Sequence, residues 1–452
     1  MTPAARWTLV VVCAATAILL LDVTVVNVAL AQIERDLDAS FDELQWVIDA
    51  YAIALAAVLL LFGSLADRIG RRRVLVAGLI VFAGASLVCA FAGDAVVLDI
   101  GRAIQGVGAA AMFATSLALL AQEFEEGEQR GFAFGVWGAV SGAAIALGPV
   151  VGGALVDAIA WEWIFLVNVP IAAALVALTI TRVPESRPGR PEPLDLPGAI
   201  TFAAALTLIV LGLTRGNGQG WGDPLIVGAL AGGAALLVVF ALLELRTAAP
   251  MLDLRLFSER AFAGTAAVAF LQSVAIYPLF LFMSLWLQNI LGYGPFETGL
   301  RLLPFTLLLF LVAPLAGRLT ARRPLGELLG AGLAMLTVGL LMMRGLDAGS
   351  DWEDTLPGLL VSGAGVGLIS PALAAAMVSV LPIERSGLAS GINNTFRQTG
   401  IAAGIAGLGA IFQRHDADAP GFAAGLNDVF LVAAGTAALG AVAALLLIRV
   451  RA

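Results

Sequence analysis

The chain has 452 residues, of which 60% are hydrophobic and only 13% are charged. Soluble domains carry about 25% charged residues, so this composition excludes an ordinary soluble protein and favours a polytopic helical membrane protein. The formal net charge is −8, with two cysteines and one histidine, which points to neither a disulfide framework nor a histidine-based metal centre. We expect no cofactor and no nucleic-acid partner.

Apolar runs long enough to cross a bilayer recur along the whole chain, since a span needs about 20 apolar residues. We predict fourteen spans, starting near Trp7, Glu43, Val74, Ala95, Gly131, Trp161, Pro197, Pro224, Ala261, Glu297, Leu325, Thr355, Ser386 and Asp428. An even number of spans places both termini on one side. The first run has no clear cleavage site, so we interpret it as a spanning helix rather than a signal peptide.

All 25 basic residues are arginines, and their distribution predicts the orientation of the protein in the membrane. With the loop after the second run inside, 18 arginines lie in cytoplasmic segments and four lie in outside loops, namely Arg35, Arg215, Arg344 and Arg414. Cytoplasmic loops accumulate positive charge, so we expect both termini in the cytoplasm. The arginine-, alanine- and glycine-rich composition favours a bacterial source, and hence a multi-pass protein of the bacterial cell (inner) membrane.

The two ends of the chain carry related patterns. The sequence of Leu315–Leu325 is an imperfect repeat of Leu65–Leu75, offset by 250 positions, and two short glycine patterns recur at similar offsets. Such ordered repeats are typical of transporters built from two parallel halves. We predict an N-terminal six-helix half over residues 1–181 and a C-terminal six-helix half over 261–452. A linker and two extra transmembrane helices occupy 182–260, and we expect a monomer.

The segment Gly63–Arg73, with the sequence GSLADRIGRRR, is a basic turn between the second and third runs. Its glycines allow a tight turn, and Asp67 can pair locally or face a helix N-terminus. From the residues alone it is a topology anchor. The pattern resembles the signature loop between helices 2 and 3 of the major facilitator superfamily. That resemblance implies a gate on the cytoplasmic side, formed by Gly63, Asp67, Arg68, Gly70, Arg71 and Arg72.

Asp22 lies well inside the first run, in the stretch LDVTVVNVAL. A charge at mid-bilayer costs about 2.5–3.5 kcal/mol on insertion scales and usually marks a functional site. The alternative is a structural hydrogen bond to Thr24 or Asn27. The stretch resembles the helix 1 motif of fourteen-helix drug:proton antiporters, which implies that Asp22 acts in cation recognition or proton coupling.

The fourth run carries Asp99 and Arg102, which face one side of a helix because they are three positions apart. A structural ion pair between them is one interpretation. The pattern from Arg102 through Gln105 to Gly108 also resembles the helix 4 motif of the same superfamily, whose arginine takes part in proton transfer. In the second run, Asp49 lies nearer the outer face, and its role stays open between function and structure.

Two further motifs extend the resemblance. Gly148, Pro149, Gly152 and Gly153 match the helix 5 motif of exporters, which implies efflux and a rocking interface, although generic close packing explains the same glycines. In the thirteenth run, Asn393, Asn394 and Arg397 lie where the resemblance implies the substrate cavity. Hydrogen bonding between helices is the alternative.

The sequence shows neither a nucleotide-binding P-loop nor a nucleophile paired with a base, so we expect no enzyme. The resemblance implies a proton-coupled antiporter in the lipid bilayer that exports hydrophobic, cationic compounds by alternating access. On this hypothesis Asp22 and Arg102 handle the proton, and the expected substrate cavity is formed by Asp22, Asn27, Asp49, Tyr51, Gln105, Asn393, Asn394 and Arg397. Two alternatives remain: a dedicated exporter of an endogenous metabolite or antibiotic, and a non-transporting membrane receptor or scaffold.

Overall fold

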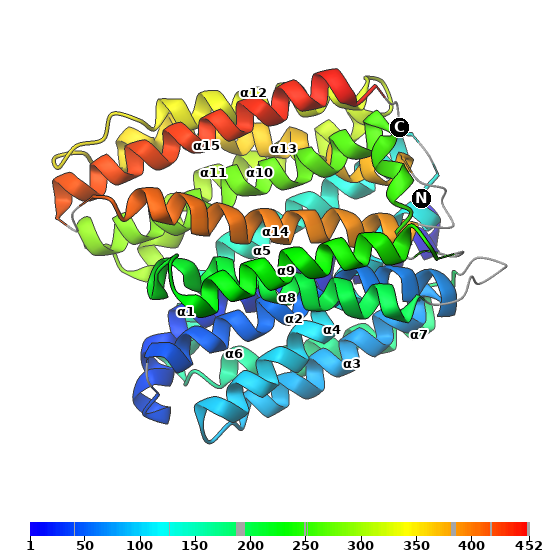
Figure 1. The fold of residues 1–452 in the computed structure, drawn as a ribbon, viewed down its shortest axis with the longest axis horizontal. Helices are drawn as coiled ribbons and strands as arrows, with labels where there is room; N and C mark the ends of the chain where they lie inside the picture. The colour runs from blue at the N-terminus through cyan, green and yellow to red at the C-terminus, as the bar shows by residue number, and fades with distance from the viewer. Residues whose placement is uncertain are drawn as a thin grey trace.

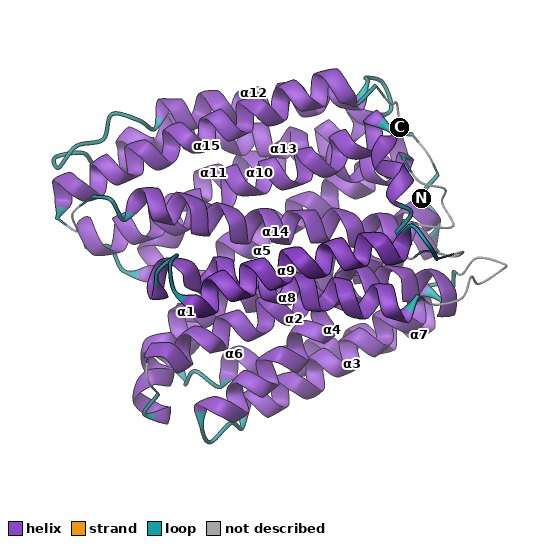
Figure 2. Cartoon of the chain, in the orientation of Figure 1, coloured by secondary structure: helices purple, strands orange, loops and turns teal. Residues whose placement is uncertain are grey.

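The computed structural model describes residues 1–39, 41–125, 127–186, 195–247, 250, 252–380, 386–415 and 418–449. Within these ranges every regular element is a helix (Figures 1 and 2). The N-terminal helices are α1 (Pro3–Leu37), α2 (Phe41–Ile69), α3 (Arg71–Ala90), α4 (Ala95–Glu123), α5 (Glu128–Ala158), α6 (Trp163–Leu166) and α7 (Asn168–Arg182). They are followed by α8 (Leu196–Gln219), α9 (Pro224–Glu244), η1 (Leu254–Ser258), α10 (Arg260–Leu285), η2 (Trp286–Ile290), α11 (Pro295–Thr320), α12 (Leu325–Met342), η3 (Trp352–Thr355), α13 (Leu356–Ser379), α14 (Ser386–Phe412) and α15 (Ala419–Leu447).

Local chemistry explains where several helices begin. Asp94, Asp223 and Asp418 precede α4, α9 and α15, and each side chain accepts a hydrogen bond from a backbone N–H of the first turn. An acidic side chain at this position satisfies an otherwise unpaired donor and interacts favourably with the positive end of the helix dipole. These aspartates therefore mark helix starts rather than binding sites.

Twelve helices in the described residues are long and apolar enough to span a membrane, and α5 makes thirteen if its two bent segments count as one span. α14 is not among them; it has 27 residues but carries Asn393, Asn394 and Arg397. Each of the fourteen predicted runs falls on a helix. The protein is thus an all-helical, multi-pass membrane protein, and the number of fourteen spans stays a prediction.

The N-terminal helices α1–α7 and the C-terminal helices α10–α15 lie side by side in Figure 1, the former below and the latter above. They meet where α5 packs against α11 and α13, and where α2 and α4 pack against α14. α8 lies against both α2 and α14 and carries α9 on its outer side. The start of α1 and the end of α15 lie at the same end of the bundle, at the right of Figure 1.

Glycines bring α5 and α11 into backbone contact near that end. A Cβ at Gly131 would overlap the carbonyl oxygen of Gly317, and a Cβ at Gly135 would overlap that of Ala313. Small residues at such positions allow helix backbones to approach closely in a membrane. This contact joins an N-terminal helix to a C-terminal one.

The glycines of the expected rocking interface face elsewhere. A Cβ at Gly148 would overlap the Thr24 hydroxyl, and a Cβ at Gly152 would lie 3.0 Å from Val25 Cγ1. Both glycines therefore pack α5 against α1, inside the N-terminal group, and Gly153 is buried beside them. α5 bends by 43° between Glu128–Ile145 and Val150–Val156. Pro149 falls in this interval, but its side chain is outside the described residues.

Three sequence expectations about loops are wrong, and the first concerns Arg35, which lies in the last turn of α1 rather than in an outside loop. Gly63–Arg73 is almost entirely helical, because α2 runs to Ile69 and α3 starts at Arg71, so that Gly70 with φ 112° makes the turn. Arg215 is not in an outside loop but within α8, where its side chain is buried. A buried acid on α2, described below, supplies the charge that allows an arginine there.

Candidate functional site

Asp22 lies on α1 at the centre of a buried polar network and is only 3% exposed. Its Oδ2 atom lies 2.5 Å from Nη1 of Arg102. Its Oδ1 atom accepts hydrogen bonds from Gln105 Nε2 at 2.8 Å and from Asn168 Nδ2 at 2.9 Å. Charge pairing and hydrogen bonds together compensate for burying the carboxylate. Helices α1, α4 and α7 thus share one buried polar site.

Arg102 takes its partners from across the N-terminal group. Its Nε donates to the Val47 carbonyl at 3.0 Å, and the guanidinium lies 4.3 Å from the ring centre of Tyr51. The neighbouring acid Asp99, three positions away on α4, is not its partner, and Asp99 Oδ1 has no hydrogen-bond partner among the described residues. The interpretation as an Asp99–Arg102 pair is therefore wrong. Arg102 is directed inward to α1 and α2 instead.

Two members of this network were not among the predicted site residues. Asn168 is buried at the start of α7, and Ser86 on α3 accepts a hydrogen bond from Gln105 Nε2 at 2.9 Å. Asn168 also lies 3.5 Å from the Ser86 hydroxyl. A lone asparagine where an apolar helix begins was the available signal for Asn168. A serine in an apolar helix carries no comparable signal, because it can satisfy its hydroxyl within its own helix.

A second buried ion pair joins α2 to α8. Asp49 Oδ2 and Arg215 Nε are 3.5 Å apart, and both side chains are 7% exposed. The Arg215 guanidinium also lies 4.2 Å from the ring centre of Trp46. Asp49 was placed nearer the outer face with its role left open, and the structure buries it against Arg215 of α8. α8 is thereby held against the N-terminal group by charge as well as by apolar packing.

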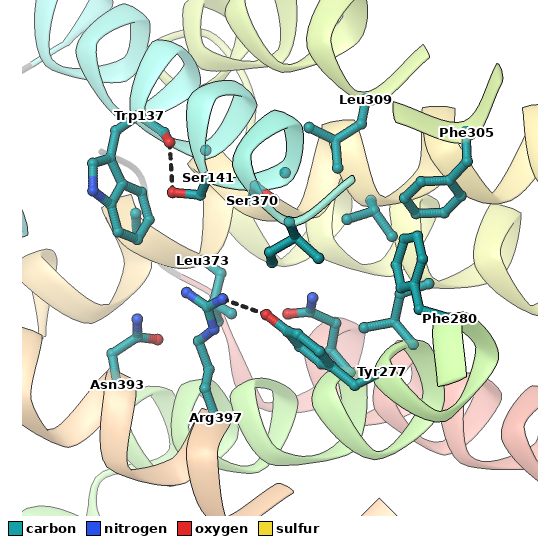
Figure 3. A pocket seen from close by; sticks show the side chains of 17 residues that line it. Trp137, Ser141, Tyr277, Phe280, Phe305, Leu309, Ser370, Leu373, Asn393 and Arg397 are labelled. Carbon is teal, nitrogen blue, oxygen red and sulfur yellow. Dashed lines mark hydrogen bonds between the residues drawn. The ribbon is translucent and has the colours of Figure 1, made fainter. Parts of the chain in front are cut away.

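A cavity of about 60 Å³ lies where the N-terminal and C-terminal helices meet (Figure 3). One wall is α5, with Trp137 and Ser141, and the other walls come from α10, α11, α13 and α14. A water molecule needs at least about 10–15 Å³ of such space, whereas drug-sized ligands occupy pockets of about 300–1,000 Å³. In this conformation the cavity has room for a few waters, and a larger compound requires the walls to separate.

The cavity is lined mainly by aromatic and aliphatic side chains, with a few polar groups among them. The aromatic members are Trp137, Tyr277, Phe280 and Phe305, and the polar members are Ser141, Gln272, Ser370, Asn393 and Arg397. Sequence analysis missed Trp137, Gln272 and Tyr277, since an aromatic residue or a single amide in an apolar run does not reveal which face it occupies. Apolar walls with a few polar groups are typical of small-molecule sites.

The predicted cavity residues divide into three groups. Asn393 and Arg397 line the cavity. Asn394 is buried beside it, with its amide 3.5 Å from the Phe113 carbonyl. The side chain of Asn27 is outside the described residues. The other members of the predicted set lie inside the N-terminal group and do not line the cavity: Asp22, Asp49, Tyr51 and Gln105.

Arg397 on α14 is the charged residue of the cavity wall. Its Nη2 donates to the Tyr277 hydroxyl at 2.8 Å, and its guanidinium lies 5.8 Å from the ring centre of Phe113. Figure 3 shows the guanidinium extending from α14 into the cavity toward Tyr277. Asn393, one turn away, is 2% exposed, and its Oδ1 has no hydrogen-bond partner in the described part of the chain.

The predicted gate residues meet at the turn between α2 and α3. Asp67 Oδ1 accepts two hydrogen bonds from Arg71, at 3.0 and 2.9 Å. Its Oδ2 accepts a hydrogen bond from the backbone N–H of Leu388, in the first turn of α14, at 2.9 Å. Asp67 therefore both pairs locally and faces a helix N-terminus, which were the two alternatives predicted for it. That helix belongs to the C-terminal group.

The segment after α7 covers the same turn. Glu185 Oε1 accepts a hydrogen bond from the backbone N–H of Arg72, and Glu185 Oε2 lies 3.8 Å from Arg72 Nε and 3.6 Å from Arg73 Nε. A Cβ at Gly70 would lie 2.6 Å from the Glu185 carboxylate, which is the movable end of a flexible side chain, so the turn needs glycine for its positive φ. Gly63 is buried in α2, and Arg68 lies at its end, partly buried.

A family model described as "Major Facilitator Superfamily" matches residues 12–405 of the chain. Puromycin resistance protein pur8 of Streptomyces alboniger is 39% identical over 417 residues, which are 90% of this chain and 82% of that protein. Multidrug resistance protein Stp of Mycobacterium tuberculosis is 37% identical over 391 residues, covering 86% of this chain and 73% of that protein.

Among solved structures, the human organic anion transporter MFSD10 superposes with a TM-score of 0.69 and covers 98% of this chain and 100% of its own. Its sequence is 16% identical, so the likeness concerns the fold alone. In the residues that the structure describes, no group of three or more His, Cys, Asp or Glu side chains could hold a metal ion.

Proposed function

The chain belongs to the Major Facilitator Superfamily, and from this premise we propose that it is a proton-coupled exporter of small hydrophobic compounds that works by alternating access. The family points to a transporter rather than an enzyme. Its members bind small-molecule substrates, and the relatives of this chain are bacterial resistance proteins. Direction, coupling and cargo are the parts that we propose.

The observation behind the proposal is the cavity between the N-terminal and C-terminal helices. Its walls combine Trp137 and Ser141 of α5 with residues of four C-terminal helices. A cavity at such a junction changes its access when the two groups move against each other. We take residues 1–181 and 261–452 as the two moving halves, with α8 and α9 as an addition to them.

Asp22 is the candidate proton carrier of this scheme. Its carboxylate is buried, and both of its oxygens are engaged by Arg102, Gln105 and Asn168. Protonation of Asp22 would remove the charge that holds Arg102, so the two residues and the helices that bear them have a reason to rearrange. This linkage makes α1 and α4 the elements through which a proton would act on the cavity.

Asp67 and Arg71 are the candidate gate. In this conformation the hydrogen bond from Leu388 to Asp67 and the contact of Gly131 with Gly317 both join the groups at the end of the bundle that bears the start of α1. The excess of arginine in the same loops supports a cytoplasmic location for this end. We therefore assign the conformation as closed toward the cytoplasm.

Export is favoured as the direction because relatives are named as puromycin and multidrug resistance proteins. Removal of a toxic compound from the cell is a route to resistance that a membrane carrier can supply. The glycine pattern in α5 resembles that of exporters, which agrees with this direction. We propose a bacterial cell membrane location, with both termini cytoplasmic.

The prediction of cationic cargo depends on Asp22 as the acid that binds it. The Asp22 oxygens are engaged by other side chains, and Asp22 does not line the cavity. The geometry therefore lends no support to a cation. We restrict the proposed cargo to hydrophobic compounds at this point.

Dye efflux from proteoliposomes under an imposed pH gradient tests the proposal. The native protein should drive efflux, and Asp22→Asn should abolish the dependence on the gradient. Asp36→Asn is the matched control, because it makes the same change on an exposed part of the same helix and should leave transport unchanged.

Other outcomes of this experiment favour other functions. Gradient-driven flux that persists in Asp22→Asn would exclude Asp22 from proton coupling. Asp49 and Asp99 would then be the next candidates for the proton carrier. A protein that moves one endogenous metabolite or antibiotic but no general dye would be a dedicated exporter. Absence of flux for every compound, with ligand binding intact, would favour a receptor or scaffold.

A further inference from the structure

We propose that the central cavity selects amphiphiles with an anionic group, which binds at Arg397 while the hydrophobic body lies against the aromatic walls. This assignment rests on the proposed function, because it names the chemical class of the exported compound. It differs from the cationic class that the sequence motifs imply. The two assignments make opposite predictions for the same measurement.

The charge of the cavity wall is the first support. Arg397 is charged, and among the described residues that line the cavity there is no aspartate or glutamate. The lining helices carry few acids: α10, α13 and α14 contain no acidic residue over their whole length, Glu297 of α11 lies in its first turn, and Glu128 and Asp157 of α5 stand at the two ends of that helix. The cavity therefore presents a positive charge without a carboxylate beside it.

Arg397 is also without an acidic partner in the described residues. Its contacts are the Tyr277 hydroxyl and the ring of Phe113. Asp22, the acid proposed to carry the proton, is paired with Arg102 rather than with Arg397. A cation in a poorly hydrated site gains most from a counter-charge, and a bound anion would supply it.

The neighbouring groups fit an oxyanion held at one end of a larger molecule. An arginine fork donates to carboxylate oxygens in a planar, directional geometry, and Figure 3 shows the guanidinium open toward the cavity. Gln272 lines the same cavity and can donate through its side-chain amide. Trp137, Phe280 and Phe305 offer aromatic surface for the rest of the ligand.

Binding of two xanthene dyes of opposite charge tests the assignment. Fluorescein is an anion at pH 8, and rhodamine 6G is a cation with a related ring system. The protein is placed in nanodiscs of phosphatidylcholine, whose headgroups are zwitterionic, and binding is followed by fluorescence anisotropy with empty nanodiscs as the blank. The variants are Arg397→Gln and Arg397→Lys. Arg344→Gln is the control, because it removes an exposed arginine outside the cavity.

We expect the native protein to bind fluorescein more tightly than rhodamine 6G. Arg397→Gln should weaken fluorescein binding by about tenfold or more, since the loss of one partner of a buried charge pair acts strongly. It should leave rhodamine binding unchanged or improved. Arg397→Lys should retain most of the preference, and Arg344→Gln should behave as native.

Two results would overturn the assignment. One is tighter binding of rhodamine 6G by the native protein. The other is an equal loss of both dyes in Arg397→Gln, which would make Arg397 a structural residue. The proposed function fails separately: anion-selective binding without gradient-driven flux refutes proton-coupled export, whereas gradient-driven flux of cations alone refutes the anionic class.

Discussion

The carboxylate of Asp67, at the end of α2, accepts a hydrogen bond from the backbone N–H of Leu388 at the start of α14, although the two residues are 321 positions apart. The same carboxylate pairs with Arg71 at 2.9 Å. An acid that faces a helix N-terminus is stabilised by the free N–H groups and by the helix dipole. One side chain thus combines a local ion pair with a contact between N-terminal and C-terminal helices.

Asp67→Ala should open the end of the bundle at which α2 ends. The change removes a helix-capping interaction, worth about 0.5–2 kcal/mol, and leaves the buried Arg71 without this carboxylate. Spin labels at Ile69 and Arg322, both exposed, should report a longer and broader distance distribution than in the native protein. Asp223→Ala also removes a capping aspartate, but one that caps the start of α9 alone, and should leave the distribution unchanged. Identical distributions for native protein and Asp67→Ala would contradict the role of Asp67 as a link between the groups.

Gly131→Ala should disturb the same end for a steric reason. A Cβ at this position would overlap the Gly317 carbonyl, and overpacking of a close contact costs about 1–3 kcal/mol. We expect a lower melting temperature and a transport rate reduced by about tenfold or more. Gly84→Ala is the control, because a Cβ there has no atom within 4 Å. A native melting temperature and native transport in Gly131→Ala would show that α5 and α11 tolerate a wider spacing.

A double-mutant cycle should measure how much the ion pair of Asp22 and Arg102 contributes to the stability of the protein. Arg102→Met leaves a buried carboxylate without its counter-charge, which costs about 3–5 kcal/mol. Adding Asp22→Asn removes that charge, so the double variant should be more stable than Arg102→Met alone. Thermal unfolding of the purified protein measures both. Additive losses would mean that the two residues act independently.

Asp49 and Arg215 should be exchangeable, since their contact is an ion pair between α2 and α8 at 3.5 Å. Arg215→Asp alone places two acids together and should strongly lower the melting temperature. The swapped variant, Asp49→Arg with Arg215→Asp, should recover part of the loss, with a coupling of about 0.5–3 kcal/mol. If the swap is no more stable than the single change, α8 is held by apolar packing and Trp46 rather than by charge.

Patterns that act over a few residues were predictable from the sequence. The apolar runs predict the helices, because a membrane requires a continuous apolar stretch whose backbone is hydrogen-bonded internally. The glycine at position 70 predicts a turn, and in the structure Gly70 makes the turn between α2 and α3 with φ 112°. The two interactions of Asp67 were predicted only as alternatives, because charge and helix ends interact by simple rules, and the structure combines them. The motif resemblance led to the superfamily that the comparisons show.

The partners of the buried charges were decided by the tertiary structure alone. Arg102 pairs with Asp22, 80 positions away, rather than with Asp99 three positions away, and Arg215 pairs with Asp49 rather than with water. Helical periodicity states which residues share a face, but the neighbour of that face depends on how distant helices pack. For the same reason the cavity contains Arg397 and Tyr277 but not Asp22. The chain by itself determined where its charges stand along each helix, and packing decided which of them meet.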